Sequence, residues 1–395
     1  MNISRGWLLV VVAAATVASG DNGKRPSPDA APDTDNGRAQ IARGEYIMNV
    51  TAACGFCHTP LLPNGTRDLD KAFSGIDCLV DLDSPTFLDD GGPTGCLSAR
   101  NLTPDPTGIG NATDAQIKNS FLNGVRTDGK KIVPLMPWYI FHNMTDDDAD
   151  AIVAYLRSLP PVSHTVKPNQ PPFSLFNDGI PVPQVPFLAT WEALTPLLDS
   201  QIPYPRGGTN NQSAMRGRYL TSTVGLCIDC HTPEISPFFL QLDMDPSDGF
   251  GGAFTGGKGF PKQQLGLIDA SYPPFIFTRN LTSDTTGLGM FTKAQIIAAI
   301  KDGRDPDGKE VCAATHGKLT APYAALTEDD VNDIAEYLIN LPAQVANCGT
   351  PPMPLDDPAP EDTADCGNLA DDDGDTVADD GCPLPCPDCQ GPAVP

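Results

Sequence analysis

The sequence has few basic residues: 25 Lys and Arg stand against 50 Asp and Glu, which gives a formal net charge of -25 at pH 7. A chain this acidic repels other polyanions at long range, which argues against nucleic acid or an anionic membrane surface as a partner. The charge favours protein partners that present a cationic docking surface.

Aromatic side chains are also scarce, at 7% of the residues, while Gly (37) and Pro (41) are frequent. This composition indicates long irregular loops, although it stays below the level typical of disordered polymers. A chain of this length is expected to form roughly two to three domains. Small domains with few aromatic side chains can fold around a prosthetic group that fills the interior.

Long apolar runs are missing beyond the first twenty residues. There, Arg5 precedes an apolar run over residues 7–17, and small residues follow at 18–20. This order predicts a secretory signal peptide over residues 1–20. An uncleaved membrane anchor is the alternative, but a membrane-spanning helix needs about 20 apolar residues. We therefore expect an exported, periplasmic protein with no transmembrane span in the mature chain.

Two C-x-x-C-H pentapeptides carry the clearest chemical signal of the chain. In such a motif two thiols add to porphyrin vinyl groups as thioethers, and the adjacent imidazole ligates the iron. Residues three apart lie on one face of a helical turn, which suits this attachment. The sequence thus predicts two covalently bound haem c groups, held by Cys54, Cys57 and His58 and by Cys227, Cys230 and His231.

Other uses of these residues remain open from the sequence. Four thiolates could form one zinc site, or the cysteines could pair as disulfides. A thioredoxin-like pair would need a βαβ context, which the sequence does not show. If haem is bound, we expect each motif His to donate its second ring N–H to a backbone carbonyl near Pro60 or Pro233.

The segments around the two motifs repeat each other in the same order. Each repeat has an R-G-x-Y segment, the motif, an R-N-L-T loop, a capping box at a helix start, and a last helix with an acidic first turn. The paired positions are 43–46 and 216–219, 100–103 and 279–282, 113–116 and 292–295, and the helix starts Thr145 and Thr327.

These repeats define the expected organisation of an all-α protein. Two helical units are separated by a Pro-rich connector and followed by a region of different composition. The predicted boundaries are 1–20 for the signal peptide, 21–40 for a linker, 41–165 and 213–345 for the two units, 166–212 for the connector, and 346–395 for an acidic Cys-rich tail.

The motif order resembles the cytochrome c domains in the cytochrome subunits of periplasmic alcohol and sugar dehydrogenases. The resemblance covers residues 41–165 and 213–345. It implies two tandem class I-like cytochrome c domains with long irregular loops. It also implies an exported dihaem cytochrome that transfers electrons between a periplasmic donor, such as a dehydrogenase, and a respiratory acceptor. Those subunits usually carry three haem domains, whereas this chain has two and an unrelated tail.

The sixth iron ligands are expected to differ between the two units. Met136 matches the distal Met of the family, with His142 and Met144 as nearby rivals. In the second unit Thr315 occupies the equivalent position, and His316 is the expected ligand. Imidazole favours Fe(III), so this haem would have the lower potential. If its distal position is open instead, the alternative function is a dihaem enzyme of peroxidase type.

The remaining candidates are weaker. Arg100 and Arg279 occupy equal positions and could pair with haem propionates, or could anchor the R-N-L-T loop. Cys78 and Cys96 could close an insertion as a disulfide, as could Cys312 and Cys348. In the tail, Cys366, Cys382, Cys386 and Cys389 are expected to pair. Carboxylates that resemble a calcium loop, or a merely solvated acidic segment, are Asp371, Asp373, Asp375 and Asp379.

Overall fold

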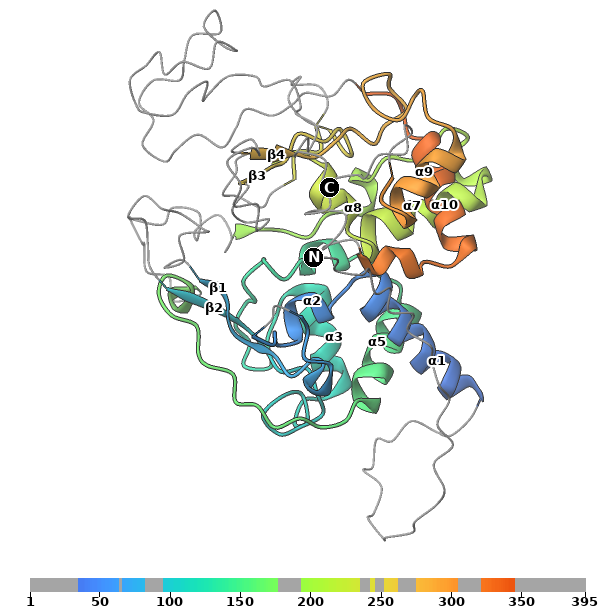
Figure 1. The fold of residues 1–395 in the computed structure, drawn as a ribbon. Coiled ribbons are helices and arrows are strands. Elements are labelled where there is room, and N and C mark those ends of the chain that lie inside the picture. Colours follow the sequence, from blue (N-terminus) through green and yellow to red (C-terminus); the bar gives the residue numbers. More distant parts are fainter. Residues whose placement is uncertain are drawn as a thin grey trace, which may run out of the picture.

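The computed structural model describes residues 35–63, 66–81, 95–176, 193–234, 242–245, 252–261, 275–304 and 321–344. Helices supply most of the regular structure in these residues (Figure 1). Several sequence predictions lie outside the described residues: the signal peptide, Thr315, His316, the pair Cys312 and Cys348, and the tail with its cysteines and aspartates.

We call residues 35–176 the N-terminal unit. Its elements, in chain order, are α1 (Asp35–Tyr46), a π-helix (Ile47–Thr51), α2 (Gly55–His58), a 3-10 helix (Leu69–Lys71), β1 (Ile76–Asp81), β2 (Cys96–Ala99), α3 (Asp114–Asn123), α4 (Trp138–Phe141), α5 (Asp146–Ser158) and a 3-10 helix (Phe173–Leu175).

We call residues 193–344 the C-terminal unit. Its elements are two 3-10 helices (Asp199–Gln201 and Gly208–Asn210), α7 (Gln212–Tyr219), a π-helix (Leu220–Val224), α8 (Cys227–His231), β3 (Gly259–Pro261), β4 (Phe275–Phe277), α9 (Lys293–Lys301), a 3-10 helix (Ala321–Ala325) and α10 (Glu328–Ile339). Apart from the 3-10 helices and α4, the order of elements from α7 to α10 repeats that from α1 to α5.

Two short antiparallel strand pairs modify the expected all-α fold. β1 pairs with β2, with Asp81 opposite Cys96, and β3 pairs with β4, with Gly259 opposite Phe277. A disulfide between Cys78 and Cys96 joins the first pair, which confirms that prediction. These strands were missed because they lie in Gly-, Pro- and Asp-rich insertions that carry no alternating apolar pattern.

The helix starts agree with the sequence patterns. Thr113 and Thr292 accept hydrogen bonds from the backbone N–H groups of Gln116 and Gln295, and each forms a complete capping box. Thr145 and Thr327 cap α5 and α10 by accepting from the backbone N–H groups of Asp148 and Asp330, ahead of acidic first turns. Capping satisfies backbone donors that would otherwise lack partners at the helix ends.

Glycine allows the first and last helices of each unit to cross closely. A Cβ atom added to Gly44 of α1 would lie 1.9 Å from the carbonyl oxygen of Ala151 in α5. A Cβ at Gly217 of α7 would lie equally close to Asp333 O in α10. No side chain fits at that separation, which explains the repeated Gly in the R-G-x-Y segments.

One continuous hydrophobic cluster runs through both units, so the described structure has a shared core. The connector contributes Leu194, Leu197 and Ile202 to it. α1 begins at Asp35, inside the stretch expected to be a linker, because its Gly44 face packs on α5. Among the described residues, no helix combines the length and the apolar character that a membrane span requires.

Two reciprocal hydrogen bonds also join the units. The Tyr46 hydroxyl donates to Asp330 Oδ2 at 2.8 Å, and the Tyr219 hydroxyl donates to Asp148 Oδ2 at 2.7 Å. Each carboxylate also binds an arginine of its own unit, at 2.7 Å from Arg43 to Asp148 and 2.5 Å from Arg216 to Asp330. The R-G-x-Y segment therefore supplies an intra-unit ion pair through its Arg and an inter-unit hydrogen bond through its Tyr.

Candidate functional site

The two C-x-x-C-H motifs have the same local backbone. Each follows a π-helix and then a non-glycine residue in the left-handed region: Ala53 with φ 46° and Leu226 with φ 56°. π-Helical turns and left-handed non-glycine residues are uncommon, and they occur frequently at functional sites. The chain then forms the short helix α8, which carries both cysteines and the histidine, or α2, which carries Cys57 and His58 and has Cys54 as its N-cap residue.

Both motif histidines are fixed by a backbone carbonyl. His58 Nδ1 lies 2.8 Å from Arg100 O, and His231 Nδ1 lies 2.7 Å from Arg279 O. A carbonyl oxygen can only accept, so each Nδ1 carries the proton, and Nε2 is the nitrogen with the lone pair. Burial lowers the pKa of His58, which favours its neutral ring. This is the tautomer that a haem iron needs, with the ring plane held by the second nitrogen.

The expected acceptors near Pro60 and Pro233 were wrong. The carbonyl of Pro60 accepts from the backbone N–H of Asp68 at 2.8 Å, and that of Pro233 accepts from Asp243 at 2.7 Å. These oxygens thus hold the chain after the motif, while the R-N-L-T loop directs an Arg carbonyl toward the imidazole ring of the motif His.

Asparagine holds this loop in place in both units. Asn101 Nδ2 donates to Val162 O at 2.8 Å, and Asn280 Nδ2 donates to Gln344 O at 2.8 Å. Both acceptors lie just beyond the last helix of the unit. Both side chains are buried, so the loop that carries the acceptor carbonyl is tied to the rest of the unit. The repeated Asn was visible in the sequence, but its acceptor was not.

The side chains of Arg100 and Arg279 remain exposed beside the histidines that their carbonyls bind. Partial burial of the guanidinium and the nearby Arg126 lower the pKa of Arg100. Arg126 itself lies 3.0 Å from Asp128. The sequence assigned these arginines a side-chain role only, and the structure adds a backbone role.

The four motif cysteines are free thiols in this structure, and they are not gathered into one group of ligands. The disulfide and single-zinc alternatives for these residues are therefore not supported. Burial raises the pKa of Cys54, Cys227 and Cys230 to about 12 and also raises that of Cys57.

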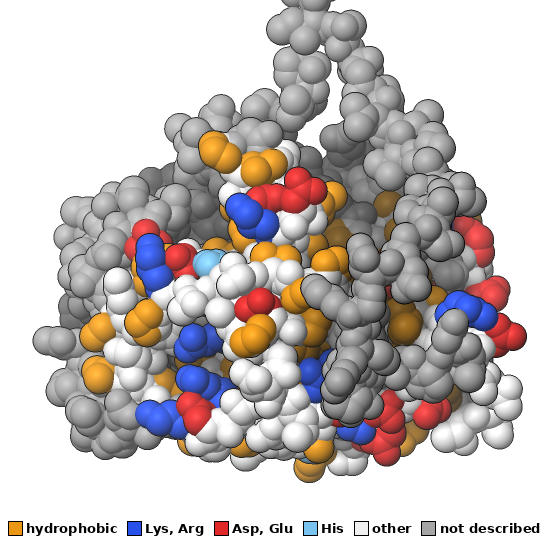
Figure 2. All heavy atoms as spheres, turned by 90° about the horizontal axis from the view of Figure 1, so that it is seen from below, with side chains coloured by type: hydrophobic (Ala, Val, Ile, Leu, Met, Phe, Trp, Pro, Cys, Tyr) orange, Lys and Arg blue, Asp and Glu red, His pale blue; other side chains and the backbone are white. Residues whose placement is uncertain are grey.

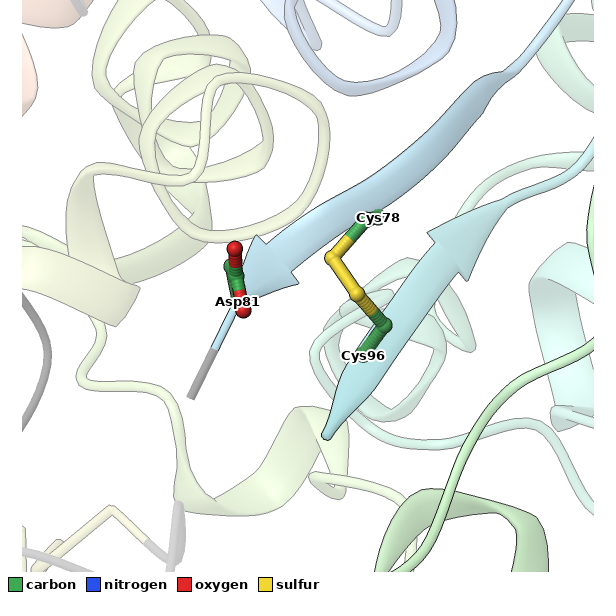
Figure 3. A group of neighbouring side chains, drawn as sticks. All are labelled: Cys78, Asp81 and Cys96. Carbon is green, nitrogen blue, oxygen red and sulfur yellow. A yellow bond between two sulfur atoms is a disulfide. The ribbon is translucent and has the colours of Figure 1, made fainter. Parts of the chain in front are cut away.

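Another cysteine group lies outside the motifs. Cys78, Asp81 and Cys96 form the one cluster of three candidate metal ligands found among the described residues. Figure 3 shows that its two sulfur atoms are bonded to each other across β1 and β2. A disulfide has no thiolate to offer, so this cluster is structural.

The three distal candidates of the N-terminal unit differ in their contacts. Met136 is half-buried in a tight turn, where its N–H donates to Val133 O at 3.1 Å and its carbonyl accepts from Trp138 N at 2.7 Å. His142 Nδ1 lies 3.0 Å from Asn123 Oδ1, and Met144 is buried in the core ahead of α5.

Comparison with known proteins supports the resemblance seen in the sequence. No protein-family model matches the chain. The chain is 28% identical, over 79% of its length, to the cytochrome c subunit of a quinone-dependent alcohol dehydrogenase from Gluconacetobacter polyoxogenes. It is 26% identical, over 78% of its length, to a fructose dehydrogenase cytochrome subunit from Gluconobacter japonicus. These matches cover 57% and 54% of the relatives, so the chain spans little more than half their length.

A shorter match points the same way. A dihaem c-type cytochrome from Cereibacter sphaeroides is 27% identical over 49% of this chain and 58% of its own length. The similarity to cytochrome c subunits of dehydrogenases, expected from the motif order, is thus confirmed.

Proposed function

We propose that the chain is an exported dihaem c-type cytochrome that carries electrons from a periplasmic donor, such as a dehydrogenase, to a respiratory acceptor. The observation that carries the proposal is the duplicated motif in which each His Nδ1 donates to an Arg carbonyl. When bound, haem c supplies reversible one-electron Fe(III)/Fe(II) chemistry.

The residues present fit such a group. Cys54 and Cys57 lie at the two ends of a helical turn and are unpaired, as thioether attachment requires. His58 presents a neutral ring whose Nδ1 proton is donated to the carbonyl oxygen of Arg100. Cys227 and Cys230 are likewise unpaired, and His231 Nδ1 donates to Arg279 O. The protein thus holds the ring planes in advance, so little motion should accompany a change of oxidation state.

Residues 41–165 and 213–345 are proposed to form tandem class I-like cytochrome c domains, each with its own haem. Met136 is the proposed sixth ligand in the first, and its thioether would raise the potential. His316 is the proposed sixth ligand in the second. The exposed guanidinium groups of Arg100 and Arg279 are proposed to bind propionates as charge-assisted donors.

The test is a comparison of electron transfer with peroxide turnover in the holoprotein. We expect fully reduced protein to be reoxidised by an electron-accepting quinone or cytochrome, and to consume no more peroxide than its own electron content allows. Rapid multi-turnover peroxide consumption would instead indicate an enzyme with an open iron site and would contradict the carrier role.

A further inference from the structure

The two motifs have different charges around them, although their backbones are alike. Asp243 N donates to Pro233 O as Asp68 N donates to Pro60 O, and the bridge between Glu234 and Leu242 corresponds to the bridge between Leu61 and Arg67. Gly256 N and Gly75 N both bind the carbonyl of the motif His. These anchors define four equivalent pairs: Phe56 and Asp229, Leu61 and Glu234, Arg67 and Leu242, and Asp77 and Lys258.

The second motif carries a buried cluster with more negative than positive charge. Lys258 Nζ lies 2.7 Å from Glu234 Oε1 and 3.7 Å from Asp229 Oδ1, and it donates to Asp229 O at 3.2 Å. The side chains of Glu234 and Lys258 are only 7% and 12% exposed. Asp229 stands between Cys227 and Cys230 in the motif itself. Two carboxylates and one ammonium therefore lie against the attachment segment.

The cluster is held together from both units. The Tyr139 hydroxyl, from α4 of the N-terminal unit, donates to Asp229 Oδ1 at 2.9 Å. Burial by itself lowers the pKa of Lys258, but Asp229 and Glu234 outweigh it, so the pKa is raised and the ammonium is retained. The groups are fixed in a region from which water is largely excluded, where charges act over longer distances than in solvent.

The first motif has a cation instead. The Arg67 guanidinium lies 4.7 Å from the centre of the Phe56 ring and donates to Thr59 O at 3.0 Å. Asp77 stands at the position equivalent to Lys258. Its carboxylate lies 3.6 Å from Lys167 Nζ and 3.5 Å from His164 Nε2. The charge facing the first motif is therefore positive.

We propose that the Asp229, Glu234 and Lys258 cluster makes the second haem the lower-potential site, while Arg67 raises the first. This inference rests on the proposed dihaem function. A negative field stabilises Fe(III) relative to Fe(II), and a positive field does the opposite. The preferred direction is then from the second site to the first, with one electron lost by Fe(II) at the second and gained by Fe(III) at the first. No bond or proton changes place.

This arrangement assigns the two ends of the molecule to different partners. The C-terminal unit receives electrons from the donor, and the N-terminal unit delivers them to the acceptor. The effect of the cluster does not depend on which residue is the sixth ligand of the second iron, because its charges adjoin the attachment segment of the motif.

Spectroelectrochemical titration of the dihaem holoprotein tests the assignment. Glu234→Gln and Asp229→Asn each remove one negative charge, and Asn keeps an oxygen that can accept from Tyr139. We expect both to raise the lower midpoint potential and leave the upper one in place. Arg67→Gln should lower the upper midpoint alone. All three variants should narrow the gap between the midpoints. Leu61→Gln, at the position equivalent to Glu234, is the matched neutral control and should move neither.

Haem content and low-spin visible spectra show whether each variant has folded, and Asp229→Asn carries the test if Glu234→Gln does not fold. A holoprotein with two haems, in which neither acidic substitution moves a midpoint, would overturn the inference. So would an Asp229→Asn protein in which only the upper midpoint rises. A wild-type protein that binds no haem would refute the proposed function itself, so the two failures can be told apart.

Discussion

The motif histidine and its carbonyl partner are the residue-scale basis of this account. The proposed ligand could be named from the sequence, because C-x-x-C-H is a local pattern. Its partner could not, since Arg100 O lies 42 residues away and backbone carbonyls leave no trace in residue type. The same is true of the buried cluster at the second motif, because Lys258 lies near Asp229 and Glu234 only in the folded chain.

Replacing Asn101 with Ala should destabilise the holoprotein by about 1–3 kcal/mol, because it leaves the buried backbone N–H of Thr103 without its acceptor and removes the bond to Val162 O. Asn280→Ala should have a similar effect at the N–H of Thr282 and at Gln344 O. Asn123→Ala, whose amide is exposed on α3, is the matched control and should change the free energy of unfolding by less than about 0.5 kcal/mol. Denaturant unfolding gives all three values. Equal effects at Asn101 and Asn123 would exclude an anchoring role.

Asp148 should make stability depend on pH in the acid range. Burial raises the pKa of Asp148, but Arg43 and Tyr219 outweigh it, so the folded pKa lies below its ordinary value. A carboxyl of this kind contributes stability above its unfolded pKa, about 3.9, and loses it as pH falls through the lower folded value.

We therefore expect Asp148→Asn to cost about 1–3 kcal/mol at pH 7, with a cost that shrinks below about pH 4. Unfolding free energies of both proteins, measured from pH 7 to pH 3, check this. A difference that stays constant down to pH 3 would contradict it.

At the scale of elements, the repeated helices and their caps were predictable because each start has a local capping pattern. The two strand pairs were not predictable, since they form in insertions without periodicity. The repeated Gly in R-G-x-Y was visible as a pattern, but the reason for it required the crossing of α1 with α5 and of α7 with α10.

Gly44→Ala tests this crossing through the sign of its effect. Ala favours a helix interior over Gly by about 0.8–1 kcal/mol, so an open site would be stabilised. The close approach to Ala151 O predicts the opposite, a loss of about 1–3 kcal/mol or more as α1 is pushed away from α5. Gly217→Ala should behave alike. Thermal unfolding of the holoprotein decides the sign, and an increase in stability for either variant would rule out the close crossing.

At the scale of the whole molecule, the two units share one core and exchange tyrosines. Tyr46 donates to Asp330 and Tyr219 to Asp148, so each unit completes a carboxylate of the other. The sequence shows both tyrosines in equivalent places, but equivalence within a repeat does not reveal a contact between repeats. On the face shown in Figure 2, Lys and Arg side chains lie among those of Asp and Glu.

Tyr46→Phe and Tyr219→Phe should each cost about 1–2 kcal/mol, because each removes a hydrogen bond to a charged and partly buried acceptor. Tyr155→Phe is the control, since its hydroxyl binds the exposed Asn49 within one unit, and it should cost less. Denaturant unfolding of single and double variants measures these costs. If Tyr155→Phe lowered the free energy of unfolding as much as the other two, the inter-unit bonds would stabilise the fold no more than a bond within one unit.

The most direct test of the central claim is the mass of the denatured, purified protein made in a host with haem-attachment machinery, read together with its pyridine haemochrome spectrum. We expect a mass increase of two haems that persists on denaturation, with a c-type absorbance band, and of one haem when Cys57 and His58 are both replaced by Ala. An unmodified mass without that band would contradict it.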